Sequence, residues 1–323
     1  MKDLRKGVRH GKMRKVQEYL EKIGEGALLF CPNPGNAGDS AIALGTYQLL
    51  ERAERPYEVV RWDEDFSSAG KVVVYGGGGN LGKSTYTEAR TFFRRHHSEA
   101  AHMALLPHTV RGNERLLLEM EGDVDIFCRE RVSYNWVRRH VNDQSVHLAD
   151  DMAFRIDADR LLDRHGPSAT ALGRHIARGI GGSALGRVPG CDPELLTHQV
   201  RGRLGVSALL RLVQGIGAQR SVLPAMRTDV ERTDHDVPPV NVDASRIFEH
   251  GVFPPSRARK ATVFLLAYLS HFERIFTNRL HLGILGALLG KEVRFYPNSY
   301  YKNRAVYRFS MAERFPNVSW EGG

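Results

Sequence analysis

Short apolar runs alternate with amphipathic segments through residue 150, and this alternation constrains the fold more than any other feature of the chain. The run Lys71–Tyr75, with three consecutive valines, is typical of a strand that is buried on both faces. Strands are predicted at residues 27–31, 57–61, 71–75, 103–106, 125–128 and 145–148, and helices at 12–23, 40–51, 85–97, 113–121 and 132–140. Strict alternation of strand and helix predicts a doubly wound, mostly parallel sheet.

The alternation weakens in the middle of the chain and resumes towards its C-terminus. Residues 1–160 are predicted to form an N-terminal α/β domain, and residues 161–220, rich in Gly, Arg and His, a partly helical inter-domain insertion. Residues 221–323 are predicted to form a smaller α/β domain, with strands at 221–226, 261–269, 274–276 and 292–296. The fold class is therefore predicted to be α/β, with two Rossmann-like domains facing a cleft, the usual place for a binding site.

Composition and charge exclude several classes of protein. The chain has 323 residues, of which 42% are hydrophobic and 26% charged, and no run approaches the roughly 18 apolar residues of a membrane span. Its three cysteines, Cys31, Cys128 and Cys191, have neither zinc-site spacing nor a disulfide pattern, which favours a reducing cytoplasm. The basic segment Met1–Arg14 has no apolar stretch behind it, so a secretory signal is not expected.

A net charge of +9 indicates anionic partners. The basic residues are scattered, and no nucleic-acid-binding motif is present, so nucleic acid is not an expected partner. Phosphorylated substrates fit this charge, and the basic N-terminal segment could contact anionic lipid headgroups. No spacing typical of a metal site stands out, and no metal is expected.

The segment Phe276–His281 follows a predicted strand and precedes an apolar helix. Arg279 and His281 would then lie at the carboxyl end of a strand, where open α/β sheets bind ligands and where helix N-termini favour anions. Arg supplies a bidentate fork for phosphate or carboxylate, and His can transfer a proton near neutral pH. The alternative is a helix cap, with Asn278 as N-cap and both side chains in solvent.

Two glycine-containing turns follow predicted strands in the first domain. Pro34–Asp39 is neither a dinucleotide fingerprint nor a Walker A loop, and Asp39 is interpreted either as a helix N-cap or as a carboxylate that accepts a proton. Gly76–Gly79 offers backbone N–H groups that could cradle a phosphate or carboxylate. Its alternative role is close packing of a strand against a helix.

Other polar residues are predicted to follow strands at the same edge. His108 and Arg129 come after two central strands, and the pair Asp150–Asp151 is interpreted as a solvated turn or, less favourably, as metal ligands. The segment Asn298–Arg304 is either an exit loop or a binding segment. Aromatic faces there suit sugar rings, and Lys302 and Arg304 suit phosphate.

Taken in order along the chain, these motifs resemble the polysaccharide pyruvyl transferase family. The resemblance rests on Gly35–Asp39, Gly76–Asn80, Pro107–Thr109, Arg129–Glu130 with Ser133, Asp151–Phe154, Arg227–Asp229 before Glu231, Arg279–His281, Gly290–Lys291 and Lys302. Residues 161–220 depart from the family pattern, so the resemblance does not predict how the acceptor is recognised. The resemblance implies an architecture similar to the GT-B glycosyltransferases. It also implies transfer of pyruvate from phosphoenolpyruvate to two hydroxyls of a sugar in an exopolysaccharide or cell-surface glycan.

For this reaction, the chemistry of the individual side chains suggests their roles. His281 is expected to be the general acid, and Asp39 to orient or deprotonate a sugar hydroxyl. Arg129 and Arg279 are expected to hold the phosphate and carboxylate of the donor, and Lys302 or Arg304 to stabilise the departing phosphate. The other expected substrate-binding residues are Leu280, Gly77, Gly78, Asn80, His108 and Asn36. No cofactor is expected, since phosphoenolpyruvate is the donor substrate.

Two other functions are compatible with the same residues. A GT-B glycosyltransferase that uses a nucleotide-sugar would need similar cations for its diphosphate. A non-enzymatic basic protein that docks on a membrane or polyanion is the second alternative. For the pyruvyl transferase, the expected location is the cytoplasm, with peripheral contact at the inner face of the membrane where a lipid-linked oligosaccharide acceptor would lie.

Overall fold

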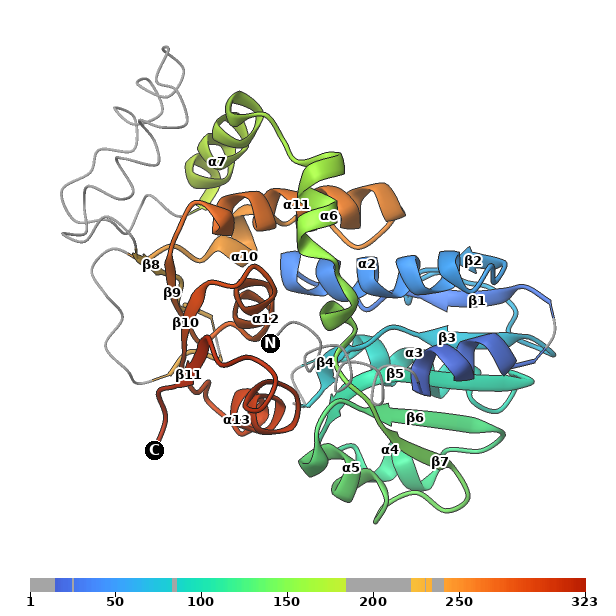
Figure 1. Ribbon diagram of the computed structural model, residues 1–323. Coiled ribbons are helices and arrows are strands. Elements are labelled where there is room, and N and C mark those ends of the chain that lie inside the picture. The colour runs from blue at the N-terminus through green and yellow to red at the C-terminus, as the bar shows by residue number, and fades with distance from the viewer. Residues whose placement is uncertain (1–14, 25, 83–85, 184–221, 230, 234–240) are drawn as a thin grey trace.

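Two separate parallel sheets make up the computed structural model, which describes residues 15–24, 26–82, 86–183, 222–229, 231–233 and 241–323 (Figure 1). The side chains of residues 177–183 are not described. The described part of the chain contains no helix that is both long and apolar enough to cross a membrane.

The first sheet has seven strands, whose neighbours all pair in parallel. They are β1 (Leu28–Cys31), β2 (Tyr57–Val59), β3 (Val72–Tyr75), β4 (Gly78–Leu81), β5 (His102–Val110), β6 (Val124–Cys128) and β7 (Ser145–Leu148). The order is β2-β1-β3-β5-β6-β7, with β4 paired beside β5. All four residues of β3 are buried, as the valine run predicts for a central parallel strand.

Five helices of the described residues precede or connect strands of this sheet. They are a helix at 15–22, α2 (Ala37–Arg52), α3 (Glu88–His96), α4 (Glu114–Leu118) and α5 (Arg131–Val137). Every strand and helix predicted through residue 150 is present within a few residues of its expected bounds. The prediction of a mostly parallel, Rossmann-like α/β sheet is therefore confirmed.

The second sheet is smaller and also parallel. Its strands are β8 (Val222–Pro224), β9 (Arg274–Thr277), β10 (Glu292–Phe295) and β11 (Val318–Trp320), in the order β11-β10-β9-β8. The helices with it are α10 (Ala244–Ile247), α11 (Pro255–Ser270), α12 (Leu280–Leu288), α13 (Lys302–Val306) and a π-helical turn at Tyr307–Met311. A 3-10 turn at Met152–Arg155, α6 (Ala158–His165) and α7 (Ala169–Ser183) follow the first sheet.

The predicted strand at 261–269 is wrong, because these residues lie within the helix α11. Nearly every residue of that stretch is buried, so the helix shows no polar face along it. A continuous apolar run of nine residues does not separate a buried strand from a buried helix. Pro255 at the first helical position is the local signal that favoured a helix.

Two further segments differ from the sequence predictions. Strand β5 continues to Val110, so His108 and Thr109 lie within the strand and not in a loop after it. Gly78–Leu81 forms β4, so the glycine run is partly a strand and not only a turn. In the expected insertion, residues 158–183 form α6 and α7, while the helices predicted at 195–203 and 206–213 lie outside the described residues.

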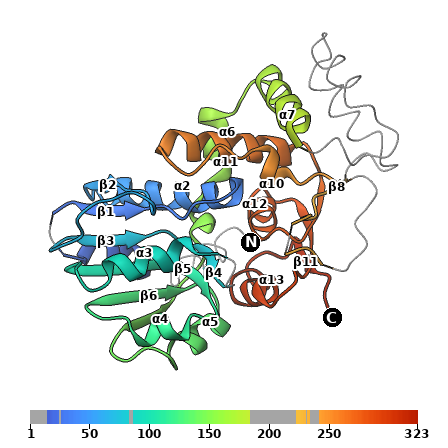
Figure 2. The ribbon, with the colours of Figure 1, turned by 180° about the vertical axis from the view of Figure 1, so that it is seen from behind.

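One apolar cluster joins the two sheets. It runs from one face of the first sheet through α2 and α11 to α12 and the second sheet, and a second cluster fills the other face of the first sheet. Both views show α11 lying along α2 on the side away from the first sheet (Figures 1 and 2). Ser40 and Tyr47 of α2 donate hydrogen bonds to the carbonyls of Gly251 and Val252, at 3.1 and 3.0 Å. This packing holds the carboxyl ends of both sheets beside one another; the domain boundaries themselves stay a prediction.

Candidate functional site

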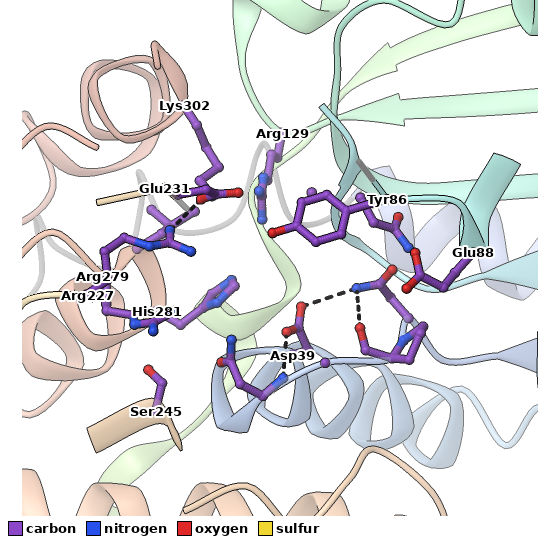
Figure 3. Close-up of a pocket in the computed structure, with 17 residues that line it drawn as sticks. Asp39, Tyr86, Glu88, Arg129, Arg227, Glu231, Ser245, Arg279, His281 and Lys302 are labelled. Carbon is purple, nitrogen blue, oxygen red and sulfur yellow. Dashed lines mark hydrogen bonds and ion pairs between the residues drawn. The ribbon is translucent and has the colours of Figure 1, made fainter. Parts of the chain in front are cut away.

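A cavity of about 250 Å³ lies where the carboxyl ends of the two sheets meet (Figure 3). Residues that follow β1, β6, β8 and β9 reach it, which is where parallel α/β sheets place their ligands. Its lining consists of Asn33, Pro34, Gly35, Asn36, Asp39, Gly79, Asn80, Tyr86, Glu88, Arg129, Arg227, Glu231, Ser245, Arg279, Leu280, His281 and Lys302. Sequence positions more than 250 residues apart, such as Asn33 and Lys302, thus share one cavity.

The start of α2 forms one wall of the cavity through a capping box. Asn36 is the N-cap, and its side chain accepts a hydrogen bond from the N–H of Gly38 at 2.8 Å. Asp39 closes the box by accepting from the N–H of Asn36 at 3.0 Å, and it also accepts from Nδ2 of Asn33 at 3.2 Å. The interpretation of Asp39 as the N-cap is therefore wrong: it is the third helical residue, where a capping-box carboxylate belongs.

Asp39 keeps a proton more readily than an ordinary aspartate. The surrounding protein strips water from its carboxyl group, and this raises its pKa, while His281 and Arg129 oppose the rise by stabilising the charged form. A carboxyl group tuned in this way, on the wall of a cavity, is suited to exchanging a proton with a ligand.

Arg129 follows β6 and extends into the cavity although only 1% of its surface is exposed. Its Nε donates to Oγ1 of Thr109 at 2.8 Å, and its Nη1 donates to Oδ2 of Asp151 at 2.7 Å. These bonds use two of the five N–H donors of the guanidinium. A Cβ on Gly79 would lie 2.9 Å from Nη2, so the absence of a side chain there leaves room for the donors that face the cavity.

Asp151 is fully buried and accepts hydrogen bonds from three groups. Besides Arg129, these are the N–H of Ala153 at 2.9 Å and Nε2 of His281 at 3.4 Å. Burial opposes ionisation, yet His281, Arg129 and this backbone N–H together hold the pKa of Asp151 below its usual range. The predicted solvated turn is wrong at Asp151, and its neighbour Asp150 is also buried and accepts from Ser310 at 2.7 Å.

His281 lies at the second residue of α12 and packs on the start of α2. A Cβ on Gly38 would overlap the His281 ring at Nδ1, so this glycine is required for close approach of the two helices. Arg279 is the N-cap of α12, and Asn278 instead accepts from the N–H of Arg227 at 2.7 Å. The alternative of an Asn278 cap with Arg279 and His281 in solvent is therefore wrong.

Arg279 is held by two carboxylates. Its Nε donates to Oδ1 of Asp243 at 2.9 Å, its Nη2 donates to the other oxygen of Asp243, and its Nη1 lies 3.0 Å from Oδ2 of Asp229. Arg227 is held similarly by Asp229, at 2.7 and 3.0 Å, and by Glu231. Each of these guanidinium groups thus has three of its five donors engaged and is fixed in orientation.

Lys302 is buried at the start of α13 and donates to Oε2 of Glu231 at 2.6 Å. Burial lowers the pKa of Lys302 to about 8, with further lowering by Arg227 and Arg129 and a counteracting effect of Glu231. Its ammonium group has three N–H donors, so donors remain after the bond to Glu231.

Carboxylates outnumber cations in and directly behind the described cavity. Its four cations, Arg129, Arg227, Arg279 and Lys302, are accompanied by carboxylates that line the cavity or lie directly behind it: Asp39, Glu88, Glu231, Asp151, Asp229 and Asp243. The net charge of +9 is therefore not concentrated here. An anion would bind through the donors that these ion pairs leave over.

Tyr86 and Glu88 complete the wall opposite α12, from the segment before α3 and the start of that helix. Burial raises the pKa of Tyr86 to about 12, with Glu231 adding to the effect, so its hydroxyl stays protonated at neutral pH. The hydroxyl points into the middle of the cavity (Figure 3) and has no hydrogen bond to another described residue. A neutral donor of this kind can bind a ligand oxygen.

Some expected site residues lie behind the cavity or away from it. His108 is buried and its Nε2 lies 2.9 Å from Oδ1 of Asn80, which itself lines the cavity. Gly77 and Gly78 lie behind the lining, and a Cβ there would meet the carbonyl of Pro107 at 2.8 Å or Nδ2 of Asn33 at 2.7 Å. Close packing thus accounts for these two glycines.

Arg304 is exposed on α13 and does not line the cavity, whereas the expected residues Asn36 and Leu280 do.

Sequence reasoning assigned no role to several residues that build the site. Arg227, Asp229 and Glu231 were noticed only as part of a motif, and Asp243 and Tyr86 were not noticed. The signal for the acidic ones was their position: each follows β8 within about 20 residues, in a stretch that also carries a buried arginine. Tyr86 carries no pattern in the sequence that distinguishes it from other tyrosines.

Comparison with solved structures shows a shared fold. No family model and no curated protein sequence matches the chain. A solved structure of an uncharacterised protein from Klebsiella pneumoniae subsp. pneumoniae NTUH-K2044 is similar, with a TM-score of 0.70 and 27% sequence identity. The likeness covers 97% of this chain and 100% of that one, so the fold described above is shared over nearly its whole length.

Proposed function

We propose that this protein is a pyruvyl transferase, which moves the pyruvate group of phosphoenolpyruvate onto two hydroxyls of a saccharide and releases phosphate. One observation carries the proposal: a cavity at the carboxyl ends of two parallel sheets brings Arg129, Lys302 and His281 together with Asp39. Cations for a phosphorylated carboxylic acid thus lie beside two groups that can exchange protons. The family resemblance and the likeness of the architecture to GT-B enzymes belong to the same proposal.

The donor would bind through the N–H groups that the ion pairs leave over. Arg129 has three such groups, and Lys302 retains donors beside its bond to Glu231. Both side chains are buried, so their hydrogen bonds to a phosphate or carboxylate would be weakly screened. Arg279 and Arg227, each held by two carboxylates, would act from fixed positions, with less loss of side-chain entropy on binding.

Proton transfers would divide between His281 and Asp39. His281 would give a proton to the methylene carbon of phosphoenolpyruvate, which leaves an oxocarbenium-like C2 that a sugar hydroxyl attacks. Asp39 would take the proton of that hydroxyl, and a second hydroxyl would then form the second C2–O bond as the C2–phosphate bond breaks. Two hydroxyl protons are released; one replaces the proton that His281 gave, and the other leaves with phosphate.

The acceptor would lie against the wall that carries Tyr86 and Glu88. An aromatic ring beside a carboxylate and the amides of Asn33 and Asn80 suits the alternating apolar and hydroxyl surfaces of a sugar. A cytoplasmic location, where phosphoenolpyruvate is made, and a lipid-linked acceptor at the inner face of the membrane are part of this proposal.

The experiment is to incubate the protein with phosphoenolpyruvate and a panel of saccharides and to measure phosphate release and acid-labile pyruvate on the sugar. We expect saccharide-dependent release, lowered about 100-fold or more in His281→Ala and retained in Arg304→Gln, an exposed control outside the cavity. Full activity of His281→Ala would remove the proposed acid. Turnover of a nucleotide-sugar, with none of phosphoenolpyruvate, would instead support the glycosyltransferase alternative.

A further inference from the structure

A second cavity, of about 270 Å³, lies at the C-terminal end of α2, against α6 and α11. Figures 1 and 2 show α6 and α11 on the side of α2 away from the first sheet. Its lining consists of Arg52, Arg160, Arg164, His165 and Arg259 together with Gln48, Glu51, Asp157 and Leu161. The first cavity lies at the other end of α2, so about 20 Å separates the two along the helix at 1.5 Å per residue.

The four arginines of this second cavity lack hydrogen-bond and ion-pair partners for their side chains among the described residues. None of Arg52, Arg160, Arg164 and Arg259 makes a side-chain hydrogen bond or ion pair with another described residue. With Glu51 and Asp157 as the carboxylates of the lining, the four guanidinium groups leave a local charge of +2. Four cations that converge with only two carboxylates repel one another, so this arrangement costs stability unless an anion binds.

Helix dipoles account for only two of these arginines. Arg52 and Arg164 lie in the last turns of α2 and α6, where a cation is favourable. Arg160 lies in the first turn of α6, after the N-cap Asp157, where the dipole disfavours a cation. Arg259 lies near the start of α11, whose first turn contains no acidic residue.

Another arginine-lined cavity, around Arg90, Arg94, Arg111 and Arg115, differs in this respect. There the guanidinium of Arg111 stacks 4.0 Å from the ring centre of Trp136, and Nε of Arg115 lies 2.6 Å from Glu119. Arg111 and Arg115 are thus stabilised by their own contacts. The two arginine clusters therefore differ in their contacts. No hydrogen bond or ion pair with a described residue compensates the arginine side chains of the cluster at α6.

We propose that the cavity formed by α2, α6 and α11 binds a phosphate group, as a phosphomonoester or a diphosphate, through its four arginines. Guanidinium groups bind phosphate oxygens through bidentate hydrogen bonds. Four of them offer more donors than a ligand with one carboxylate group could use, so a phosphate group fits the cavity better. His165 adds a ring N–H donor to the same lining. The site is independent of the proposed catalytic cavity and of the reaction assigned to it.

The test uses pyrophosphate as the probe and the full chain as the protein. Calorimetry at low salt measures affinity, and amide hydrogen exchange identifies which peptides the probe protects. We expect protection of α6 and the end of α2, and a roughly 10- to 100-fold weaker affinity for that site in Arg160→Gln/Arg164→Gln. Both side chains are exposed on one helix face, so this variant should fold. The matched control, Arg90→Gln/Arg94→Gln, removes the same charge at the same spacing from α3 and should bind normally.

A second arm distinguishes a free phosphate from a lipid headgroup. Vesicles of phosphatidylcholine with or without phosphatidic acid are sedimented with wild type and both variants. Binding of pyrophosphate in solution, or of phosphatidic acid vesicles alone, supports the site if Arg160→Gln/Arg164→Gln weakens it and the control does not. Equal loss in both variants, binding unchanged by either, or no binding of either probe would overturn the proposal.

Discussion

The guanidinium of Arg129 donates to Oδ2 of Asp151 at 2.7 Å, and both side chains are almost completely buried. The two residues follow neighbouring strands, β6 and β7, at the carboxyl edge of the first sheet. The same oxygen of Asp151 lies 3.4 Å from Nε2 of His281, which belongs to a helix beside the second sheet. A single carboxylate oxygen therefore orients a guanidinium group and an imidazole ring that come from beside different sheets.

Asp151→Asn is expected to impair both stability and activity. Asn keeps the size of the side chain but leaves Arg129 as a buried, uncompensated charge, which typically costs about 3–5 kcal/mol. Urea unfolding measures this loss, and turnover of phosphoenolpyruvate should fall because Arg129 and His281 lose their shared acceptor. Asp150→Asn is the control, since Asp150 contacts Ser310 and Arg314 and not the cavity. Turnover that is equal in the two variants would contradict this role of Asp151.

Gly38→Ala is expected to displace His281 with little effect on folding. The new methyl would overlap the His281 ring, while alanine favours the helix by up to about 1 kcal/mol relative to glycine. A misplaced catalytic group costs about 100-fold in rate. The measurement is a double-mutant cycle with His281→Ala. Gly38→Ala should lower turnover in wild type and change little when His281 is already absent; an equal loss in both backgrounds would show that it acts elsewhere.

Lys302 is expected to make donor binding depend on pH near 8. Its lowered pKa of about 8 means that the ammonium form is complete well below pH 8 and is lost above it. Affinity for phosphoenolpyruvate, measured by calorimetry, should therefore fall between pH 7 and 9. Lys302→Arg keeps its charge throughout this range and should flatten the dependence. An identical pH profile in the two proteins would exclude Lys302 from donor binding.

His108 is expected to destabilise the fold in acid. Burial, with the nearby Arg129, lowers its pKa to about 3, whereas the unfolded chain titrates near the ordinary value of 6.5. The unfolded state then binds more protons between these values, so stability falls as pH falls from 6.5 towards 3. The loss should reach about 2 kcal/mol between pH 6.5 and 5, at 1.36 kcal/mol for each pH unit.

The check on His108 is urea unfolding of wild type and His108→Gln at several pH values. Gln can still donate to Asn80 but does not titrate, so the difference in stability between the two proteins isolates the histidine. A difference that stays constant between pH 6.5 and 5 would contradict the neutral, buried state of His108.

Periodicity sufficed for the first sheet because each element had a distinct pattern. The valines of β3 and the polar residues that follow β6 and β9 indicated both the strands and the edge at which a site would lie. Periodicity does not identify an element that is buried on all sides, because no polar face interrupts its apolar residues. Residues 261–269 of α11 are nearly all buried in this way. A strand and a helix look alike in such a run.

The sequence could not predict which side chains pair with one another through hydrogen bonds and ion pairs. Asp151 looked like half of an exposed acidic pair, and only the fold places Arg129 and His281 beside it. Arg304 and Lys302 looked equally suitable for phosphate, yet two positions on a helix separate a buried lysine from an exposed arginine. Gly77 and Gly78 suggested a phosphate cradle, but the groups that approach them closely are the carbonyl of Pro107 and the side chain of Asn33.

The most direct measurement is thermal unfolding with phosphoenolpyruvate, inorganic phosphate, UDP and GDP, because a ligand of the folded state raises its stability. Wild type should be stabilised more by phosphoenolpyruvate than by phosphate. Arg129→Gln should lose this difference, and Arg304→Gln should keep it. Stabilisation by a nucleotide alone, or a phosphoenolpyruvate effect no larger than that of phosphate, would contradict the proposal that this cavity binds phosphoenolpyruvate.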